Sequence, residues 1–139
     1  MRLWHEALIP YLPRQQLLGQ HRECCALRGR GWGRPHATVN YVFNHHPALL
    51  FAYHYLIMEE MKHRGYHPDK IWYNPSYRGT TLGFDKNFID DEKEVTDVKE
   101  LLDNIHFIYD CIYPEHNDKY LQECLENLKQ KGIDLYEKL

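Results

Sequence analysis

The sequence predicts an all-α protein, with residues 1–139 forming a single compact domain of about four main helices and a long aromatic-rich loop. Apolar side chains recur at helical spacing in four separate stretches. The length is that of one ordinary domain, and 43% hydrophobic with 27% charged residues is typical of a folded chain. No apolar run approaches the roughly 20 residues of a membrane span, so we expect no membrane contact.

The first eleven residues form a short apolar arm. Leu3, Trp4, Leu8 and Ile9 are expected to pin it to the core and so hold the terminal amine in one place. Charged residues and a proline interrupt any signal-peptide core. The four cysteines show no Cys-x-x-Cys spacing, which favours reduced thiols and a cytoplasmic location.

The first helix is predicted from Pro13 to about Arg28. Its apolar stripe consists of Leu17, Leu18, His21, Cys24 and Cys25. Glu23 falls on the opposite face, which we expect to be wet and which also carries Gln16, Gly19, Gln20 and Leu27. Gly19, one turn before Glu23, exposes backbone there and favours close approach of a ligand or another chain segment.

Three glycines and a proline end this helix within residues 29–35. Arg28, Arg30 and Arg34 alternate with the glycines, a pattern suited to contacts with a phosphate backbone. The alternative is a basic surface loop with Trp32 folded beneath it. Residues 36–44 are interpreted as a helical turn or an extended connector.

A second helix begins at Pro47 and ends at Gly65, where a left-handed cap is expected. Its buried face consists of Leu50, Tyr53, His54, Ile57, Met58 and Met61. Residues 66–88 show no period and are rich in aromatic residues, proline and glycine. They predict a long ordered loop, of the kind that is usually functional in a compact domain.

The third helix is predicted to follow the acidic run at residues 90–92 and to end before Pro114. Its apolar stripe consists of Val95, Val98, Leu102, Ile105, Tyr109 and Ile112. The last helix is expected from about His116 to Gln130, with Gly132 ending it.

Charge is distributed unevenly along the chain. Residues 1–80 carry ten Lys and Arg against five Asp and Glu, whereas residues 81–139 carry seven against fifteen. A half that faces nucleic acid and an acidic, solvated half would produce this pattern, and so would chance variation of surface charge.

The standard catalytic motifs are absent: there is no P-loop, no Gly-x-Ser-x-Gly, no His-Glu-x-x-His and no zinc-type Cys/His spacing. What remains is one carboxylate, basic neighbours and a pinned chain start. A terminal amine has a pKa near 7.7–8.0, so part of it is neutral at pH 7. Such an amine can form an imine with an electrophilic carbon while a carboxylate transfers protons.

Two motifs carry a resemblance to a known family. The register of Leu12, Gln15, Leu17 and Arg22-Glu23, counted from Met1, resembles the phage-type pyrimidine-dimer DNA glycosylases (endonuclease V). The stretch Glu60–Tyr66 is similar to the end of that family's second helix. The resemblance covers Met1 to about Tyr66 and indicates a divergent cellular branch.

The resemblance implies a DNA repair glycosylase with AP-lyase (endonuclease) activity on damaged, pyrimidine-dimer-type double-stranded DNA, needing no cofactor or metal and acting as a monomer. It implies that a terminal amine, here that of Met1, forms a Schiff base at C1′, and that Glu23 is the catalytic carboxylate. It implies that Arg22 contacts phosphate or the base pocket, and Arg2, Arg28, Arg30 and Arg34 are the other expected DNA contacts.

The chain departs from the family at three places. Residue 2 is Arg, where the family exposes a Thr amine by removing Met; Ala26 stands in place of a helix arginine; and residues 115–139 are acidic rather than basic. Two other function classes stay open. One is a metal-dependent hydrolase using His45, His46 and His54, and the other a non-catalytic helical module that binds nucleic acid or protein.

Overall fold

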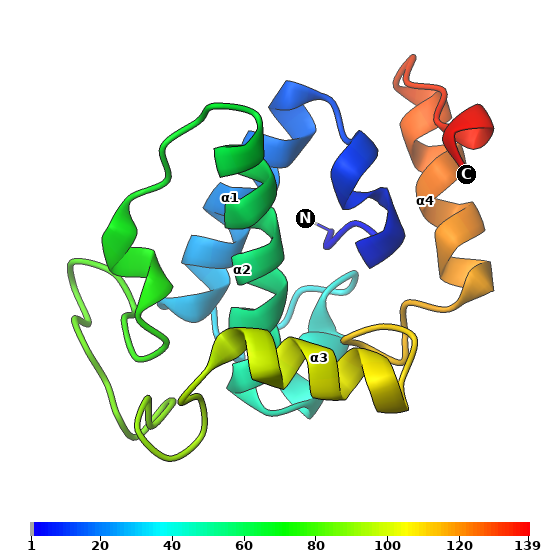
Figure 1. Cartoon of the computed structure of the whole chain (residues 1–139). Helices are drawn as coiled ribbons and strands as arrows, with labels where there is room; N and C mark the ends of the chain where they lie inside the picture. The colour runs from blue at the N-terminus through cyan, green and yellow to red at the C-terminus, as the bar shows by residue number, and fades with distance from the viewer. Residues whose placement is uncertain (1) are drawn as a thin grey trace.

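The computed structural model describes residues 2–139; the predicted nucleophile Met1 lies outside them. The α-helices in this range are α1 (Arg14–Arg28), α2 (Pro47–His63), α3 (Val98–Ile108) and α4 (Asp118–Gln130) (Figure 1). Short 3-10 helices are η1 (Glu6–Tyr11), η2 (Asn40–Asn44), η3 (Lys70–Tyr73) and η4 (Tyr136–Lys138). Residues 2–139 contain no β-strand, so the all-α prediction is confirmed. None of these helices has the length and apolarity needed to cross a bilayer.

Helices α1 and α2 pack side by side at the centre of the fold (Figure 1). Helix α3 crosses this pair, and α4 lies on the other side of the N-terminal segment. Helix α2 begins at Pro47, where His46 Nδ1 accepts a hydrogen bond from the Ala48 N–H at 3.0 Å. It is followed by Gly65 with φ of +88°, the expected left-handed cap. Both ends of α2 therefore follow local sequence signals.

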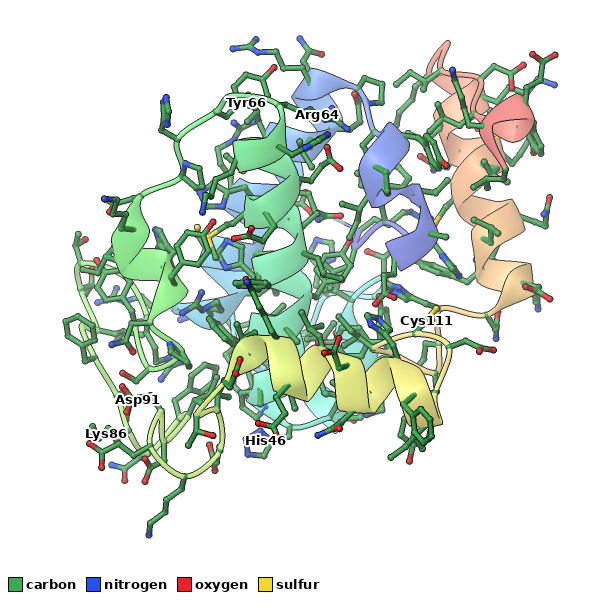
Figure 2. All side chains as sticks on the ribbon, viewed as in Figure 1. His46, Arg64, Tyr66, Lys86, Asp91 and Cys111 are labelled. Atoms are coloured by element: carbon green, nitrogen blue, oxygen red, sulfur yellow. The ribbon has the colours of Figure 1, made fainter. Side chains whose placement is uncertain are left out.

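Arg64 connects the end of α2 to the start of α1 (Figure 2). Its guanidinium is paired with Glu60 at 3.0 Å and donates a hydrogen bond to the Leu12 carbonyl at 2.6 Å. The neighbouring Tyr66 ring lies under the Arg14 guanidinium at 5.8 Å. Residues 60–66, which follow the family resemblance, thus hold the N-terminal end of α1 against the C-terminal end of α2.

Helix α3 is shorter than predicted at both ends. Asp97 accepts hydrogen bonds from the Lys99 and Glu100 N–H groups and starts the helix there, because a side-chain cap satisfies donors that the helix leaves unpaired. At the other end, the Glu6 carboxylate accepts the Ile112 N–H at 3.1 Å and turns the chain inward. As a result Tyr109 is 64% exposed, although the helical stripe had placed it inside.

Helix α4 begins two residues later than predicted, with Asn117 capping the Tyr120 N–H. Gly132, with φ of +83°, follows its last turn as expected. The segment between α3 and α4, with Cys111 in it, passes beside η1 (Figure 2). The cysteines Cys24, Cys25, Cys111 and Cys124 are all free thiols.

The long loop expected at residues 66–88 is present, interrupted by η3 and by an isolated bridge between Tyr77 and Phe84. Trp32 is half-buried and packs edge-on against Phe43 and Phe88, with ring centroids 5.1 Å apart in each pair. The glycine-rich segment therefore has its tryptophan folded beneath it, as the alternative interpretation expected.

Both halves of the chain build the main core. The arm is pinned as predicted, with Leu3 and Leu8 fully buried and Trp4 and Ile9 nearly so. Buried partners from the C-terminal half in the same cluster are Leu102, Ile112, Tyr113, Cys124, Leu125, Leu128 and Leu135. The N-terminal segment is thus held in place by residues from distant parts of the chain.

Candidate active site

The N-terminal segment meets Glu23 of α1. The Arg2 backbone N–H donates a hydrogen bond to Glu23 Oε2, with the two atoms 3.4 Å apart. The segment enters the molecule between α2 and α4, near the label N in Figure 1. The structure thus brings the chain start and the predicted catalytic carboxylate together.

Gln20 is the residue through which this contact is organised. Its side chain is only 2% exposed. Its Nε2 donates to the Arg2 carbonyl at 3.0 Å and to Glu23 Oε2 at 3.2 Å. Its Oε1 accepts from the Trp4 N–H at 2.7 Å and from the Tyr53 hydroxyl at 3.1 Å. One buried amide therefore joins α1, α2 and the N-terminal segment.

Helix α4 closes the site from the other side. The Tyr120 hydroxyl donates to the Leu3 carbonyl at 2.5 Å. The Arg2 guanidinium lies over the rings of Trp4 and Tyr120, 5.9 and 5.6 Å from their centroids. The single proton of the Tyr53 hydroxyl is shared between the Trp4 carbonyl, at 2.6 Å, and Gln20 Oε1. Carbonyls and N–H groups of residues 2–4 are thus fixed from three helices, α1, α2 and α4.

Burial raises the pKa of Glu23 above its usual range, because removal from water disfavours the charged carboxylate. The hydrogen bonds from the Arg2 N–H and from Gln20 favour the charged form and lower the pKa in part, as does the charge of His36. A half-buried carboxylate whose pKa is raised is better able to hold a proton than a solvated one, as proton transfer requires.

The helix face that carries Glu23 was expected to be exposed to solvent, and this is wrong for two of its residues, Gln20 and Leu27. Each is 2% exposed, and Gln20 is in contact with the N-terminal segment through Arg2 and Trp4. The expected approach of another chain segment at Gly19 is not seen within residues 2–139, where the only atom within 4 Å of an added Cβ would be Arg22 Nη2 of the same helix, at 3.7 Å. The Arg22 side chain thus reaches back along α1 to Gly19.

The five arginines expected to contact DNA occupy different environments. Arg22, Arg30 and Arg34 are exposed on α1 and the segment after it. Arg2 is half-buried against aromatic rings, as described above. Arg28 is 0% exposed, so the expectation that it contacts DNA is wrong for this conformation.

Arg28 instead anchors the aromatic loop. Its guanidinium donates to the carbonyls of Trp72, Asn74 and Tyr77 at 2.8, 2.7 and 3.0 Å. It also donates to His54 Nδ1 at 2.9 Å. Burial lowers the pKa of Arg28 to about 10, so the guanidinium stays charged at neutral pH. These three contacts join residues more than 40 positions apart, so no local sequence pattern could have predicted that Arg28 is buried.

One group in residues 2–139 has the composition of a metal site: His21, Cys25 and His54, whose ligand atoms lie within 4.8 Å of one another. Arginine can only donate, so the contact with Arg28 makes His54 Nδ1 an acceptor and leaves the proton on Nε2. That proton points to His21 Nδ1, 2.8 Å away. Metal ligation would need Nε2 free, and metal-bound histidines usually donate from the other nitrogen. The group therefore fits a directed hydrogen-bond chain better than a metal.

The histidines of the metal-hydrolase alternative do not come together. His45 pairs with Glu115 at 2.8 Å and His46 with Glu94 at 3.2 Å. His54 is fully buried on α2 and joins His21 instead, and burial lowers the pKa of both imidazoles. His21 itself lies in a packed cluster, as the sequence had favoured.

A groove of about 500 Å³ lies at the C-terminal end of α1, beside the loop that Arg28 anchors. Aromatic rings of Trp72 and Tyr77 and the side chains of Arg30 and Arg78 line part of it. Arg78 donates to the carbonyls of Arg28 and Gly29 at 2.8 and 3.0 Å, which fixes the loop against the helix end. The long loop thus adds a basic, aromatic surface to the C-terminal end of α1.

Sequence reasoning missed Gln20, Tyr53 and Tyr120 as parts of the site. The one available signal was that Gln20 shares a helix face with both Glu23 and the apolar Leu27, which is unusual for a solvated face.

The fold and the site define a small helical protein that holds its N-terminal segment against a half-buried carboxylate, beside exposed arginines. A model of the pyrimidine dimer DNA glycosylase family matches residues 1–74, more than half of the chain, and the chain belongs to this family. Membership places it among the glycosylases of DNA repair, whose substrate is DNA. Searches of curated proteins and of solved structures gave no match.

Proposed function

We propose that this protein is a DNA glycosylase with AP-lyase activity, which acts on pyrimidine-dimer-type lesions in double-stranded DNA through its terminal amine and Glu23. The observation that carries the proposal is the hydrogen bond of 3.4 Å between the Arg2 N–H and Glu23 Oε2. It fixes the second residue of the chain against the only carboxylate that the family motif singles out.

Covalent geometry extends this contact to the amine. The nitrogen of the residue before Arg2 is joined to the Arg2 nitrogen by three bonds, which span less than the roughly 3.8 Å between successive Cα atoms. The observed contact of the Arg2 nitrogen with Glu23 is thus one residue away from the terminal amine along the chain. A reacting sugar carbon between the two groups would be reachable from both.

The chemistry balances with these two groups. The neutral amine attacks C1′, the bond between C1′ and the base nitrogen breaks, and the base leaves with the electron pair and takes a proton from water. The amine passes a proton to Glu23, and Glu23 returns it to O4′ as the sugar ring opens, which gives a Schiff base. Removal of a C2′ proton then expels the 3′ phosphate and cuts the strand, and water releases the enzyme.

The exposed arginines support binding of an extended polyanion. Arg22 lies next to Glu23, and Arg30 and Arg34 follow the end of α1. Salt-dependent phosphate contacts of this kind position a duplex without reading its sequence. Chemistry at C1′ requires the target nucleotide to leave the stack, which basic and space-filling groups around the site would favour.

Borohydride trapping tests the proposal directly. The protein is incubated with duplex DNA that contains one dimer or one abasic site, and the imine is reduced to a stable amine. We expect a covalent adduct that maps to the first residue and is lost in Glu23→Gln. The control variant Glu123→Gln on α4 removes an exposed carboxylate and should trap normally.

Chemical acetylation of the terminal amine provides the second arm. Acetylated protein should keep its fold and lose strand cleavage altogether. Nicking of abasic DNA by acetylated protein would show that the nucleophile is wrong. DNA binding without trapping or cleavage would favour the non-catalytic alternative.

A further inference from the structure

We propose that Gln20 is a positioning residue that sets the geometry and the ionisation of Glu23 relative to the chain start. This inference rests on the proposed function, since it concerns how the amine and the carboxylate are held for that reaction. It assigns a role to a residue that belongs to neither reacting group.

The orientation of the Gln20 amide is fixed by its partners. The Trp4 N–H can only donate and the Arg2 carbonyl can only accept, so Oε1 faces the first and Nε2 the second. The second Nε2 proton is donated to Glu23. The Tyr53 hydroxyl has a single proton, which is shared between Gln20 Oε1 and the Trp4 carbonyl. Both protons and one lone pair of the buried amide therefore have their own partners, and these partners fix its orientation.

This arrangement acts on one oxygen of the carboxylate. Within residues 2–139, the hydrogen bonds to Glu23 from Arg2 and from Gln20 both end on Oε2. Oε1 is then the oxygen that remains for proton transfer to and from the substrate. Gln20 holds Oε2 in place and thereby sets the direction in which Oε1 faces.

Only an amide performs both tasks at this position. A carboxylate at residue 20 could not donate to the Arg2 carbonyl and would place a like charge beside Glu23. An apolar side chain of the same length would leave the Trp4 N–H and the Arg2 carbonyl without this partner. The charges that act on Glu23 from other elements are those of the terminal amine and of His36, and both lower its pKa.

The experiment compares full-length Gln20→Met with wild type by two readouts. The first is the pKa of Glu23, followed by the ¹³C shift of its carboxyl carbon, which is assigned by its loss in Glu23→Gln. We expect an upward shift of about half to one unit, because a hydrogen bond to the charged form is lost. The second is the rate of trapping at saturating DNA, which should fall at least about tenfold while the DNA concentration for half-saturation stays constant.

The matched control is Gln16→Met, the same chemical change one turn earlier on α1. It should leave both the Glu23 pKa and the trapping rate at wild-type values. A merely structural role for Gln20 would lower the yield of folded protein without moving the pKa of Glu23 in the fraction that folds.

Gln20→Glu keeps the inference testable if Gln20→Met does not fold. It retains the shape and polarity of the side chain, and the added charge should raise the Glu23 pKa further than the loss of one hydrogen bond. An unchanged Glu23 pKa in a folded Gln20 variant overturns the inference, even if wild-type protein traps DNA at its first residue. Absence of trapping in wild type, with a shifted pKa in the variant, overturns the proposed function instead.

Discussion

The two halves of this molecule use buried space differently. In residues 1–74, helices α1 and α2 bury polar groups, among them Gln20, Arg28 and His54, each with hydrogen-bond partners. In residues 75–139, helices α3 and α4 are amphipathic, and the end of α3 leaves the apolar side chain of Phe107 91% exposed. Buried polar groups cost stability unless they have partners, and four of the six buried polar side chains in residues 2–139 lie in the family-matched half, whereas Ser76 and His116 lie in the other. The family-matched half is therefore where more of the geometry is specified by polar contacts.

The largest expected effect concerns the dependence of the first half on the second. A chain ending at residue 74 would retain the whole family-matched segment, but it would lose Tyr113, Leu125 and Leu128, which are buried in the same core as Leu3. We therefore expect the 1–74 fragment to be unfolded by circular dichroism and to show no trapping. A cooperatively folded fragment would contradict the prediction that residues 1–139 form one domain.

The next prediction concerns the anchor of the aromatic loop. Arg28→Met removes the donor to three loop carbonyls, and we expect it to lower the free energy of unfolding by about 3–5 kcal/mol. Arg30→Met, two residues on and exposed, should change it by less than about 0.5 kcal/mol. Urea denaturation of both variants measures the difference, and equal stabilities would refute the anchoring role.

Acid should weaken the packing between the halves through His116. Its Nδ1 accepts the Glu6 N–H at 3.2 Å, and burial lowers its pKa to about 3. In the unfolded chain His116 binds a proton near pH 6.5, whereas in the folded protein it stays neutral down to about pH 3. The free energy of unfolding therefore decreases as the pH falls from about 6.5 to 3.

The comparison with His116→Gln isolates this group. The variant should be less stable than wild type at pH 7, because contacts with Glu6 and Tyr41 are altered. On acidification the variant should lose less stability than wild type. The two slopes should differ by at most the effect of one proton, which is about a tenfold change in the folding equilibrium per pH unit. Parallel curves for the two proteins, from urea unfolding at several pH values, would contradict the assignment.

The smallest expected effect is at the end of α3. Phe107→Ser removes a side chain that is almost fully exposed, so the free energy of unfolding should change by less than about 0.5 kcal/mol. Thermal unfolding of this variant checks whether the apolar end of α3 adds anything to the stability of the isolated chain. A decrease in the free energy of unfolding of more than about 1 kcal/mol would show that the end of α3 is packed, against the contrast drawn between the two halves.

The parts of the fold that follow local signals were predictable. Pro47 and Gly65 bound α2, and the pinned arm and the extent of α1 follow from apolar spacing and the glycines after Arg28. The limits of α3 were not predicted, because its start depends on the cap at Asp97 and its end on the distant Glu6.

The site was predictable only as a pair of positions. Family register singled out Glu23 and the chain start, whereas the burial of Gln20 depends on a segment that docks from 16 residues away along the chain. Arg28 has the same composition signal as Arg30 and Arg34, and only the long-range contact with the loop separates them. Pairwise contacts of this kind leave no periodic mark in a single sequence.

The fixed position of residues 2–4 has a practical consequence for preparing the protein. A purification tag fused ahead of Met1 would convert the primary amine into an amide nitrogen, which is not nucleophilic, and would add bulk beside Glu23. Under the proposed mechanism, recombinant protein made that way would not cleave DNA, however well it folded. Leu139 is 55% exposed, so a tag belongs at that end of the polypeptide.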